Sequence, residues 1–316
     1  MFQTSAKREQ SAKREQGAKR QLSAERQLSA ERQPSPTCRI AAAGVAQRAL
    51  LKAALPRTVL AKTALTIALA AGLSAIARPA DAVVGATGSG GPLADASVMV
   101  LGSRGSVCSA VVVAPDAVLT AAHCVTGADA FRVHFRERGE PVLIEPRTIA
   151  VHPGYVPNAI RTRQRSIDLA LVRLPAPLPA RFTTASLVAS QRSPAAGTSL
   201  VLGGWGVARE GDGASSGTFR TASLVAVEPY GPSHILIWAA DPAGRGKTAG
   251  AGVCRGDSGG PIALGSGGIV AISTWSKGPG KQECGLISQG VLVGPQRAFI
   301  DRTLAGWGRR ASWVGE

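Results

Sequence analysis

The feature that most constrains this chain is an eight-residue string at 254–261, Cys-Arg-Gly-Asp-Ser-Gly-Gly-Pro. Its three glycines let the backbone turn sharply and approach a ligand with no side chain in between. Ser258 stands in the middle of the string, where its hydroxyl and nearby backbone N–H groups can face a single point. Taken alone, the string is compatible with an ordinary glycine-rich loop. Its meaning depends on what else the chain supplies.

Two further strings supply the groups that a reactive serine needs. A serine hydroxyl is a weak nucleophile unless a base removes its proton, and histidine suits that task because its pKa lies near 6.5. His123 lies in the string Thr-Ala-Ala-His-Cys, and Asp168 opens the apolar run Asp-Leu-Ala-Leu-Val. Each residue alone is typical of a structural histidine, a strand-end aspartate or a loop serine. The three together, with gaps of 45 and 90 residues, predict a catalytic set.

These strings, their order and their spacing resemble the chymotrypsin/trypsin family of serine endopeptidases over residues 83–308. The resemblance implies an all-β fold of two packed antiparallel six-stranded β-barrels with a C-terminal helix. It makes Ser258 the nucleophile, His123 the general base and Asp168 the residue that orients the imidazole. The backbone N–H groups of Gly256 and Ser258 would form the oxyanion hole. This chemistry needs no metal or cofactor, and none is expected.

The charge of the chain is concentrated near its N-terminus. Residues 1–82 hold 14 of the 36 basic residues and 5 of the 20 acidic ones, so they supply +9 of the net charge of +16. The remaining 234 residues carry only +7, without interleaved aromatic and basic residues that would stack on bases. Nucleic acid is therefore not an expected partner. A body of this length is sufficient for a sizeable core.

Residues 1–56 form a low-complexity basic tract with repeats such as Ser-Ala-Lys-Arg-Glu-Gln at 5–10 and 11–16. A period of six residues makes no continuous helical seam, and few of these residues could bury a core. The tract is predicted to be disordered, or to lie upstream of the true translation start; a basic interaction arm is the functional alternative.

Residues 57–82 follow, with basic residues before a charge-free run at 63–77, and are predicted to be a signal peptide. A retained signal anchor is the alternative, although 15 residues is short for a span.

The protease domain is predicted to comprise residues 83–316, and its start carries a hypothesis about activation. Ala80-Asp81-Ala82 is a small-residue cleavage signal, and cutting after Ala82 frees Val83-Val84-Gly85. The family resemblance implies that the new α-amino group of Val83 pairs with Asp257. Secretion itself would then activate the enzyme. Cleavage after Ala77, at Ala75-Ile76-Ala77, is the competing site.

The chain has five cysteines, of which Cys38 lies in the tract that is predicted to be removed. An even four remain, as expected for an oxidising compartment. The resemblance pairs Cys108 with Cys124 and Cys254 with Cys284. Zinc binding is the alternative, but the chain has no C-x-x-C pair.

Substrate preference is predicted from the position six residues before Ser258. Trypsin-type members have an aspartate there, which selects lysine or arginine, whereas this chain has Gly252. A pocket base without a carboxylate cannot offset the desolvation of a basic side chain. We therefore expect cleavage after apolar or small residues. The segment Ser273-Thr274-Trp275-Ser276 resembles the substrate-binding strand of the family, but it has an extra residue and carries Ser276 where glycine is usual. The residues predicted to line the pocket are Gly252, Val253, Ser273, Thr274, Trp275, Ser276 and Gly290.

The rest of the body is predicted to consist of short strands at 106–113, 117–120, 131–135, 168–174, 201–206, 268–275 and 290–293. Phe299, Ile300, Leu304 and Trp307 recur at helical spacing and predict the C-terminal helix. The expected protein is a secreted monomer that acts on protein or peptide substrates, with no stable membrane anchor once the signal is cut. The alternatives are a catalytically silent homologue that acts as a binding module, and a membrane-tethered protease that retains residues 1–82.

Overall fold

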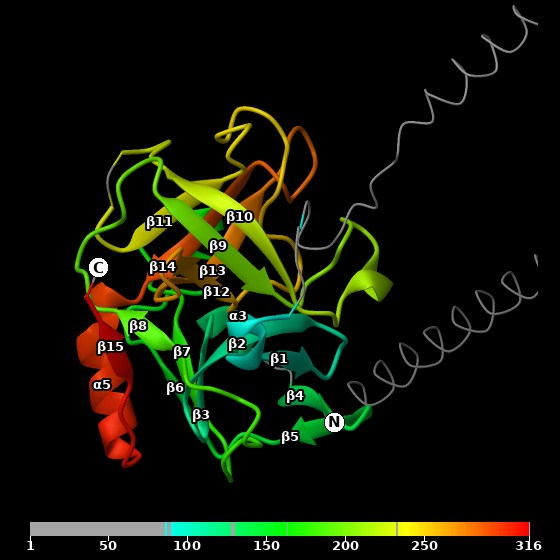
Figure 1. Cartoon of the computed structure of the whole chain (residues 1–316), viewed down its shortest axis with the longest axis vertical. Coiled ribbons are helices and arrows are strands. Elements are labelled where there is room, and N and C mark those ends of the chain that lie inside the picture. The colour runs from blue at the N-terminus through cyan, green and yellow to red at the C-terminus, as the bar shows by residue number, and fades with distance from the viewer. Residues whose placement is uncertain (1–85, 87–89, 128–129, 163, 232, 316) are drawn as a thin grey trace, which may run out of the picture. The chain divides into compact units, whose positions relative to one another are not determined.

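The computed structural model describes residues 86, 90–127, 130–162, 164–231 and 233–315 (Figure 1). These residues belong to one unit, Ile76–Glu316. The tract at 1–56, the signal segment at 57–82 and Val83 lie outside the described residues. Among the helices that are described, none is long and apolar enough to cross a membrane.

The N-terminal half folds into a sheet of seven antiparallel strands in the order β5-β4-β1-β2-β3-β7-β6. Alternation along β4 explains its position, because Phe131, Val133 and Phe135 are buried while the residues between them are half-exposed. Its strands are β1 (Ser97–Gly102), β2 (Val107–Ala114), β3 (Ala117–Thr120), β4 (Phe131–Glu137), β5 (Glu140–Ile144), β6 (Thr148–Val151) and β7 (Ala170–Arg173).

The C-terminal half forms a second sheet, in which six strands close a ring. Their order is β12-β9-β10-β11-β14-β13, and β12 also pairs with β13. Two short strands, β8 and β15, extend the ring by parallel pairing. The strands are β8 (Ser186–Val188), β9 (Ser199–Gly204), β10 (Arg220–Val227), β11 (Leu236–Ala240), β12 (Pro261–Leu264), β13 (Ile269–Lys277), β14 (Ile287–Leu292) and β15 (Ser312–Val314).

Helical structure is short except at the C-terminus. Helix α5 buries Phe299, Ile300 and Leu304, three of the residues whose spacing predicted it, and Trp307 follows as its C-cap. The helical segments are α3 (Pro92–Asp95), α4 (Ala159–Thr162), α5 (Arg297–Gly306) and the 3₁₀ turns η1 (Ala122–Cys124), η2 (Gly213–Ser215) and η3 (Gly294–Gln296).

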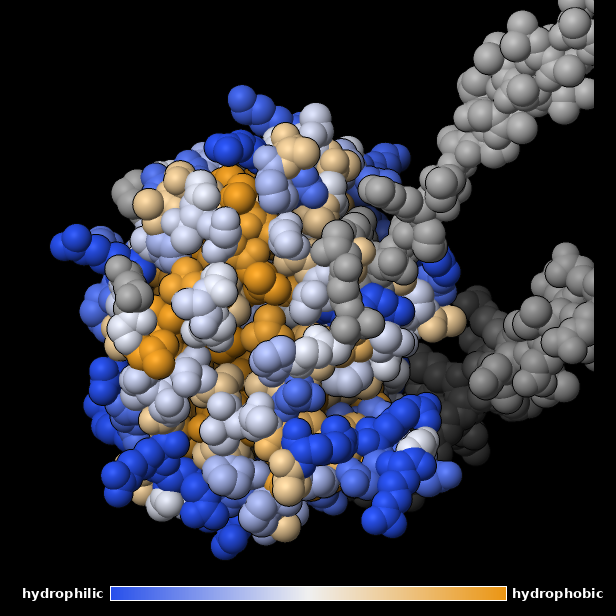
Figure 2. Space-filling view, viewed as in Figure 1, coloured by the Kyte–Doolittle hydropathy of each residue, from blue (hydrophilic) through white to orange (hydrophobic). Residues whose placement is uncertain are grey.

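The predicted fold class is therefore confirmed: two β-barrel-like halves with a C-terminal helix (Figure 1). The strand counts differ from six and six. The first sheet has seven strands because short, largely exposed segments such as β5 and β6 still pair with their neighbours, and the second gains β8 and β15. On the face in Figure 2, apolar residues gather over β9, β10 and β11, and hydrophilic residues cover the lower edge.

Candidate active site

His123 and Asp168 make the closest polar contact of the predicted set. His123 Nδ1 lies 2.6 Å from Asp168 Oδ2, and the backbone N–H of His123 donates to Asp168 Oδ1 at 2.9 Å. The carboxylate therefore holds both the ring and the main chain of the histidine. His123 lies in η1, directly after β3, and Asp168 directly precedes the buried Leu169 and strand β7. Because β3 and β7 are antiparallel neighbours, residues 45 apart in sequence meet at one end of the sheet.

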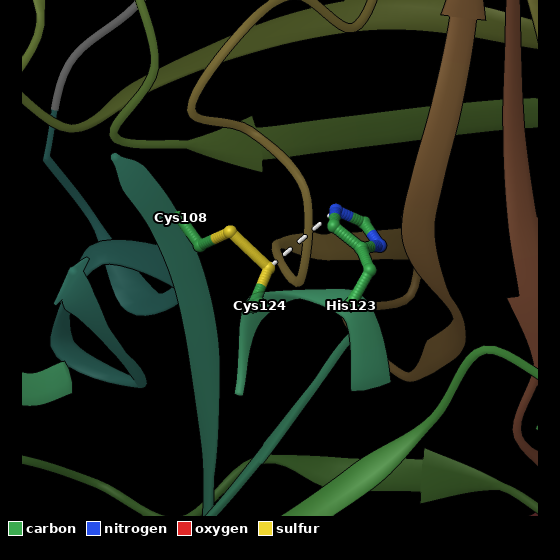
Figure 3. A group of neighbouring side chains, drawn as sticks. All are labelled: Cys108, His123 and Cys124. Atoms are coloured by element: carbon green, nitrogen blue, oxygen red, sulfur yellow. Dashed lines mark hydrogen bonds between the residues drawn. A yellow bond between two sulfur atoms is a disulfide. The ribbon is translucent and has the colours of Figure 1, made fainter. Parts of the chain in front are cut away.

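The disulfide Cys108–Cys124 fixes η1 to β2. Figure 3 shows the imidazole of His123 beside this disulfide, with one ring nitrogen facing the sulfur of Cys124; Nε2 is 3.7 Å from that Sγ. These three residues bring two sulfurs and an imidazole together, but both sulfurs are bonded to each other. They are not thiolates, so the group lacks the donors that a zinc site requires.

Ser258 lies next to the same disulfide. Its carbonyl oxygen accepts a hydrogen bond from the N–H of Ser109 on β2 at 2.7 Å, and it is 3.7 Å from Cys124 Sγ. The structure thus brings His123 and Ser258 to the same disulfide, with Asp168 bonded to the far side of the imidazole. In the described part of the chain the Ser258 hydroxyl makes no hydrogen bond, so no contact joins it to His123. Contacts of this kind are commonly loose until substrate binds.

The loop at residues 254–261, which carries the candidate nucleophile and is called the nucleophile loop below, packs so closely that it requires its glycines. Gly259 has φ +85°, and a Cβ there would lie 2.0 Å from the carbonyl oxygen of Ser109. A Cβ on Gly260 would lie 2.3 Å from the carbonyl oxygen of Gly203. The loop is therefore wedged between β2 of the first sheet and β9 of the second, which no larger residue would allow.

Three backbone N–H groups of this loop, those of Arg255, Gly256 and Ser258, have no acceptor among the described residues. The N–H of Asp257 donates to Cys254 and that of Gly259 donates to Ser273, whereas the N–H groups of Gly256 and Ser258 donate to no described acceptor. Gly256 itself has φ +97°, a conformation that glycine adopts without strain. The two predicted oxyanion donors are thus available to a ligand.

Asp257 is completely buried beneath the loop. Its carboxylate accepts hydrogen bonds from the N–H groups of Gly206 and Cys254, both at 2.9 Å. A Cβ on Gly204 would fall 2.1 Å from the same carboxylate, so the residue sits in a tight cradle. Burial raises the pKa of Asp257 to about 7, although the two N–H donors and the charge of Arg220 act in the opposite direction.

Val83, the predicted partner of Asp257, lies outside the described residues. Ala86, three positions further along, is buried in the core of the second barrel. It belongs to the same apolar cluster as Ala251 and Val253, which precede the nucleophile loop.

The second predicted disulfide, Cys254–Cys284, is also present. The residues beside it are joined as well, because the guanidinium of Arg255 makes two hydrogen bonds to the carboxylate of Glu283, at 2.6 and 2.8 Å. Glu210 accepts from the N–H groups of Glu283 and Cys284. Arg255 and Glu283 are largely exposed, so this ion pair contributes little to stability; its effect is to restrict the loop.

The strand that carries the predicted pocket residues contains an irregularity that the sequence left ambiguous. Along β13 and β14, Ser273 pairs with Gly290 and Trp275 pairs with Gln289, with a register shift between them. Thr274 is therefore the extra residue, accommodated as a bulge. After the bulge Ser276 pairs with Ser288.

Gly252, the predicted pocket base, lies beside Ser288 of β14. A Cβ on Gly252 would lie 3.0 Å from Ser288 Oγ, and the N–H of Val253 donates to the same oxygen at 2.9 Å. A Cβ on Gly290 would instead meet Ile262 and Ala271 in the barrel interior. Ser288, which is not among the predicted pocket residues, is therefore the β14 side chain beside Gly252. Nothing in the sequence around Ser288 indicated this contact, because Gly252 and Ser288 are brought together only by the packing of separate segments.

A cavity of about 880 Å³ opens beside His123 and Asp168. It reaches from the segment after β6 in the first barrel to strands β11, β13 and β14 in the second, where Trp238, Thr274 and Gln289 line it. Trp238 also packs edge-on against Trp275, with ring centroids 6.2 Å apart. The candidate catalytic pair therefore faces a space large enough for several residues of a peptide.

A comparison with known families agrees with this geometry, because a family model described as Trypsin matches residues 84–292. The chain belongs to the trypsin family. Human kallikrein-11 is 28% identical over 187 residues, which cover 55% of this chain and 63% of that protein. Trypsin zeta of Drosophila melanogaster is 30% identical over 209 residues, which cover 60% of this chain and 71% of that protein.

The fold of this trypsin-family chain also matches a solved structure, mouse neuropsin, described as a serine protease expressed in the limbic system of the brain. The TM-score is 0.55, and the match covers 69% of this chain and 98% of neuropsin. Because the two sequences are only 21% identical, this likeness speaks for the fold alone.

Proposed function

We propose that this chain is a secreted serine endopeptidase that hydrolyses peptide bonds through Ser258, His123 and Asp168. The observation that carries the proposal is the 2.6 Å contact between His123 Nδ1 and Asp168 Oδ2. It fixes the imidazole so that Nε2 faces the disulfide against which the Ser258 backbone also lies. A base held in this way is what a serine nucleophile requires.

The mechanism follows from these positions. His123 Nε2 takes the hydroxyl proton as Ser258 Oγ attacks the substrate carbonyl, and Asp168 stabilises the imidazolium that forms. The free N–H groups of Gly256 and Ser258 bind the oxyanion. Collapse of the tetrahedral intermediate transfers the proton to the departing amine, and water then hydrolyses the acyl-enzyme. His123 serves as base in the second half-reaction as it did in the first. These steps use no metal or cofactor.

We propose a preference for apolar or small residues before the scissile bond. Gly252, the candidate pocket base, carries no carboxylate, and Ser276 and Ser288 occupy paired positions of β13 and β14. Ser288 already accepts a hydrogen bond from Val253, and Ser276 donates one to the Glu283 carbonyl at 2.8 Å. A pocket of this kind favours a short side chain over a long cationic one.

Secretion and activation are proposed together. Two disulfides favour an oxidising compartment. The buried carboxylate of Asp257 has no cationic hydrogen-bond partner among the described residues, and an ammonium delivered by Val83 after cleavage at Ala82 would supply one. We further propose that the chain acts on protein or peptide substrates as a monomer. Removal of residues 1–82 would release it from the membrane.

A fluorophosphonate probe tests the catalytic proposal directly, since it labels only an activated serine. We expect stoichiometric labelling of the secreted protein, loss of labelling in Ser258→Ala, and full labelling in the matched variant Ser266→Ala, whose serine lies on an exposed turn. No labelling of correctly folded protein would favour a silent homologue that acts as a binding module.

Sequencing the N-terminus of the secreted protein tests the activation proposal, because a mature start at Arg78 or upstream contradicts it. Cell fractionation distinguishes a tethered form, and a panel of peptides that showed cleavage after Lys or Arg would overturn the pocket assignment.

A further inference from the structure

Ser109, on β2 beside Cys108, is completely buried and yet fully hydrogen-bonded. Its hydroxyl donates to the carbonyl oxygen of Gly256 at 2.9 Å and accepts from the N–H of Trp205 at 3.0 Å. Its backbone N–H donates to the carbonyl oxygen of Ser258 at 2.7 Å. One residue of the first barrel thus holds the nucleophile loop at two points and also binds the segment that follows β9. A buried polar side chain is costly unless its hydrogen bonds are made, and here they are all made across the interface between the barrels.

We propose that Ser109 is a positioning residue for the oxyanion hole, an inference that rests on the proposed function. The two carbonyls that it binds belong to Gly256 and Ser258, whose own N–H groups are the candidate oxyanion donors. A glycine at φ +97° has wide rotational freedom, so the loop needs an external restraint to keep its peptide groups in one orientation. The Ser109 hydroxyl provides that restraint on the peptide group between the two donors. Its backbone N–H provides a second restraint immediately after the nucleophile.

The packing around Ser109 shows that the restraint is rigid. Pairing with Met99 on β1 fixes the backbone of Ser109, and its carbonyl oxygen accepts a further hydrogen bond from Thr120 Oγ1 at 2.7 Å. A Cβ on Gly260 would lie 3.3 Å from the Cβ of Ser109, so the loop and β2 are in direct contact. The carbonyl of Gly256 therefore cannot shift far without losing its partner. Donors that are fixed before the reaction stabilise an oxyanion better than donors that must first reorient.

Ser109→Ala in the active-site-titrated enzyme tests this role. We expect kcat to fall about tenfold, less than the loss of a donor itself would cause, while KM for a neutral peptide stays within about twofold. Affinity for a peptide boronate, whose adduct places an oxyanion in the hole, is expected to fall by the same factor as kcat/KM. Affinity for a matched peptide that binds without an adduct is expected to remain unchanged. If Ser109→Ala does not fold, Ser109→Gly removes the same hydroxyl without leaving a methyl group in a polar site.

Thr120→Val is the matched control, because it removes a buried hydroxyl from the same network but no contact with Gly256. We expect it to lower the melting temperature and to leave kcat within about twofold. The proposal is overturned if both variants reduce kcat equally, or if Ser109→Ala weakens the boronate and the non-covalent peptide to the same extent. Fluorophosphonate labelling of the wild-type protein at Ser258 tests the proposed function before any Ser109 variant is compared, so a failure of the proposed function is distinguishable from a failure of this inference.

Discussion

The environment of Asp257 gives a prediction about the uncut chain that can be worked through quantitatively. Burial raises its pKa from the model-peptide value of 3.8 to about 7. A difference of about three units corresponds to about 4 kcal/mol between the protonated and ionised forms. In the native state the carboxyl keeps its proton up to about pH 7, whereas the unfolded chain releases it near pH 4. The native state thus binds more protons between these values, and stability falls as the pH rises through this window.

Asp257→Asn is the perturbation that isolates this effect. Both versions carry Ser258→Ala to prevent self-digestion, and both retain residues that precede Val83. Urea unfolding followed by tryptophan fluorescence between pH 4 and pH 8 measures the free energy of unfolding. Relative to the asparagine variant, the aspartate chain is expected to lose about 4 kcal/mol across this range, an upper estimate because the structure relaxes around a buried charge.

The same chain starting at Val83 is expected to keep its free energy of unfolding as the pH rises. Its free ammonium pairs with the carboxylate, lowers the pKa of Asp257 and removes the loss of stability above pH 4. If the aspartate and asparagine chains with preceding residues show identical pH dependence, the burial argument is wrong. If the chain that starts at Val83 still loses stability with rising pH, the ammonium does not reach Asp257.

Three other predictions concern the catalytic pair, the pocket and the nucleophile loop. Asp168→Asn is expected to lower kcat by about 10³–10⁴ with little change in fold, because the amide fixes the wrong imidazole tautomer; steady-state kinetics beside a circular dichroism spectrum measures it, and retained activity would contradict the role of Asp168. Ser276→Gly combined with Ser288→Gly is expected to widen the pocket and move the preferred residue from small to larger apolar side chains, so an unchanged peptide profile would show that these serines do not bound it. Gly259→Ala places a methyl group 2.0 Å from a carbonyl oxygen and is expected to cost several kcal/mol, whereas Gly265→Ala meets no atom within 4 Å and is expected to cost less than about 1 kcal/mol. Thermal melts compare the two, and equal melting temperatures would refute the packing argument.

The sequence alone identified the residues whose chemistry is local. Ser258 among its glycines, His123 beside a cysteine and Asp168 before an apolar run became recognisable as a candidate set through their order and spacing, which are visible in the sequence. The family resemblance supplied both disulfides and the two-barrel fold, and the structure confirms them. The absence of a carboxylate at Gly252 was also visible in the sequence. Such features are predictable because residue type and short spacing already determine what a segment can do.

Other features were decided only by contacts between distant segments. The sequence contained the extra residue Thr274, but only the pairing of β13 with β14 showed that it forms a bulge. Only the packing around Gly252 showed that Ser288 lies beside it. Nothing in the string around Ser109 revealed that its hydroxyl meets Gly256, 147 residues away. Strand register and buried hydrogen bonds are properties of the packed barrels, because a one-residue shift in pairing reverses which side chains face a pocket. The residue types thus determined the chemistry available to this protein, and the packing of the two barrels determined which side chains from distant segments lie together.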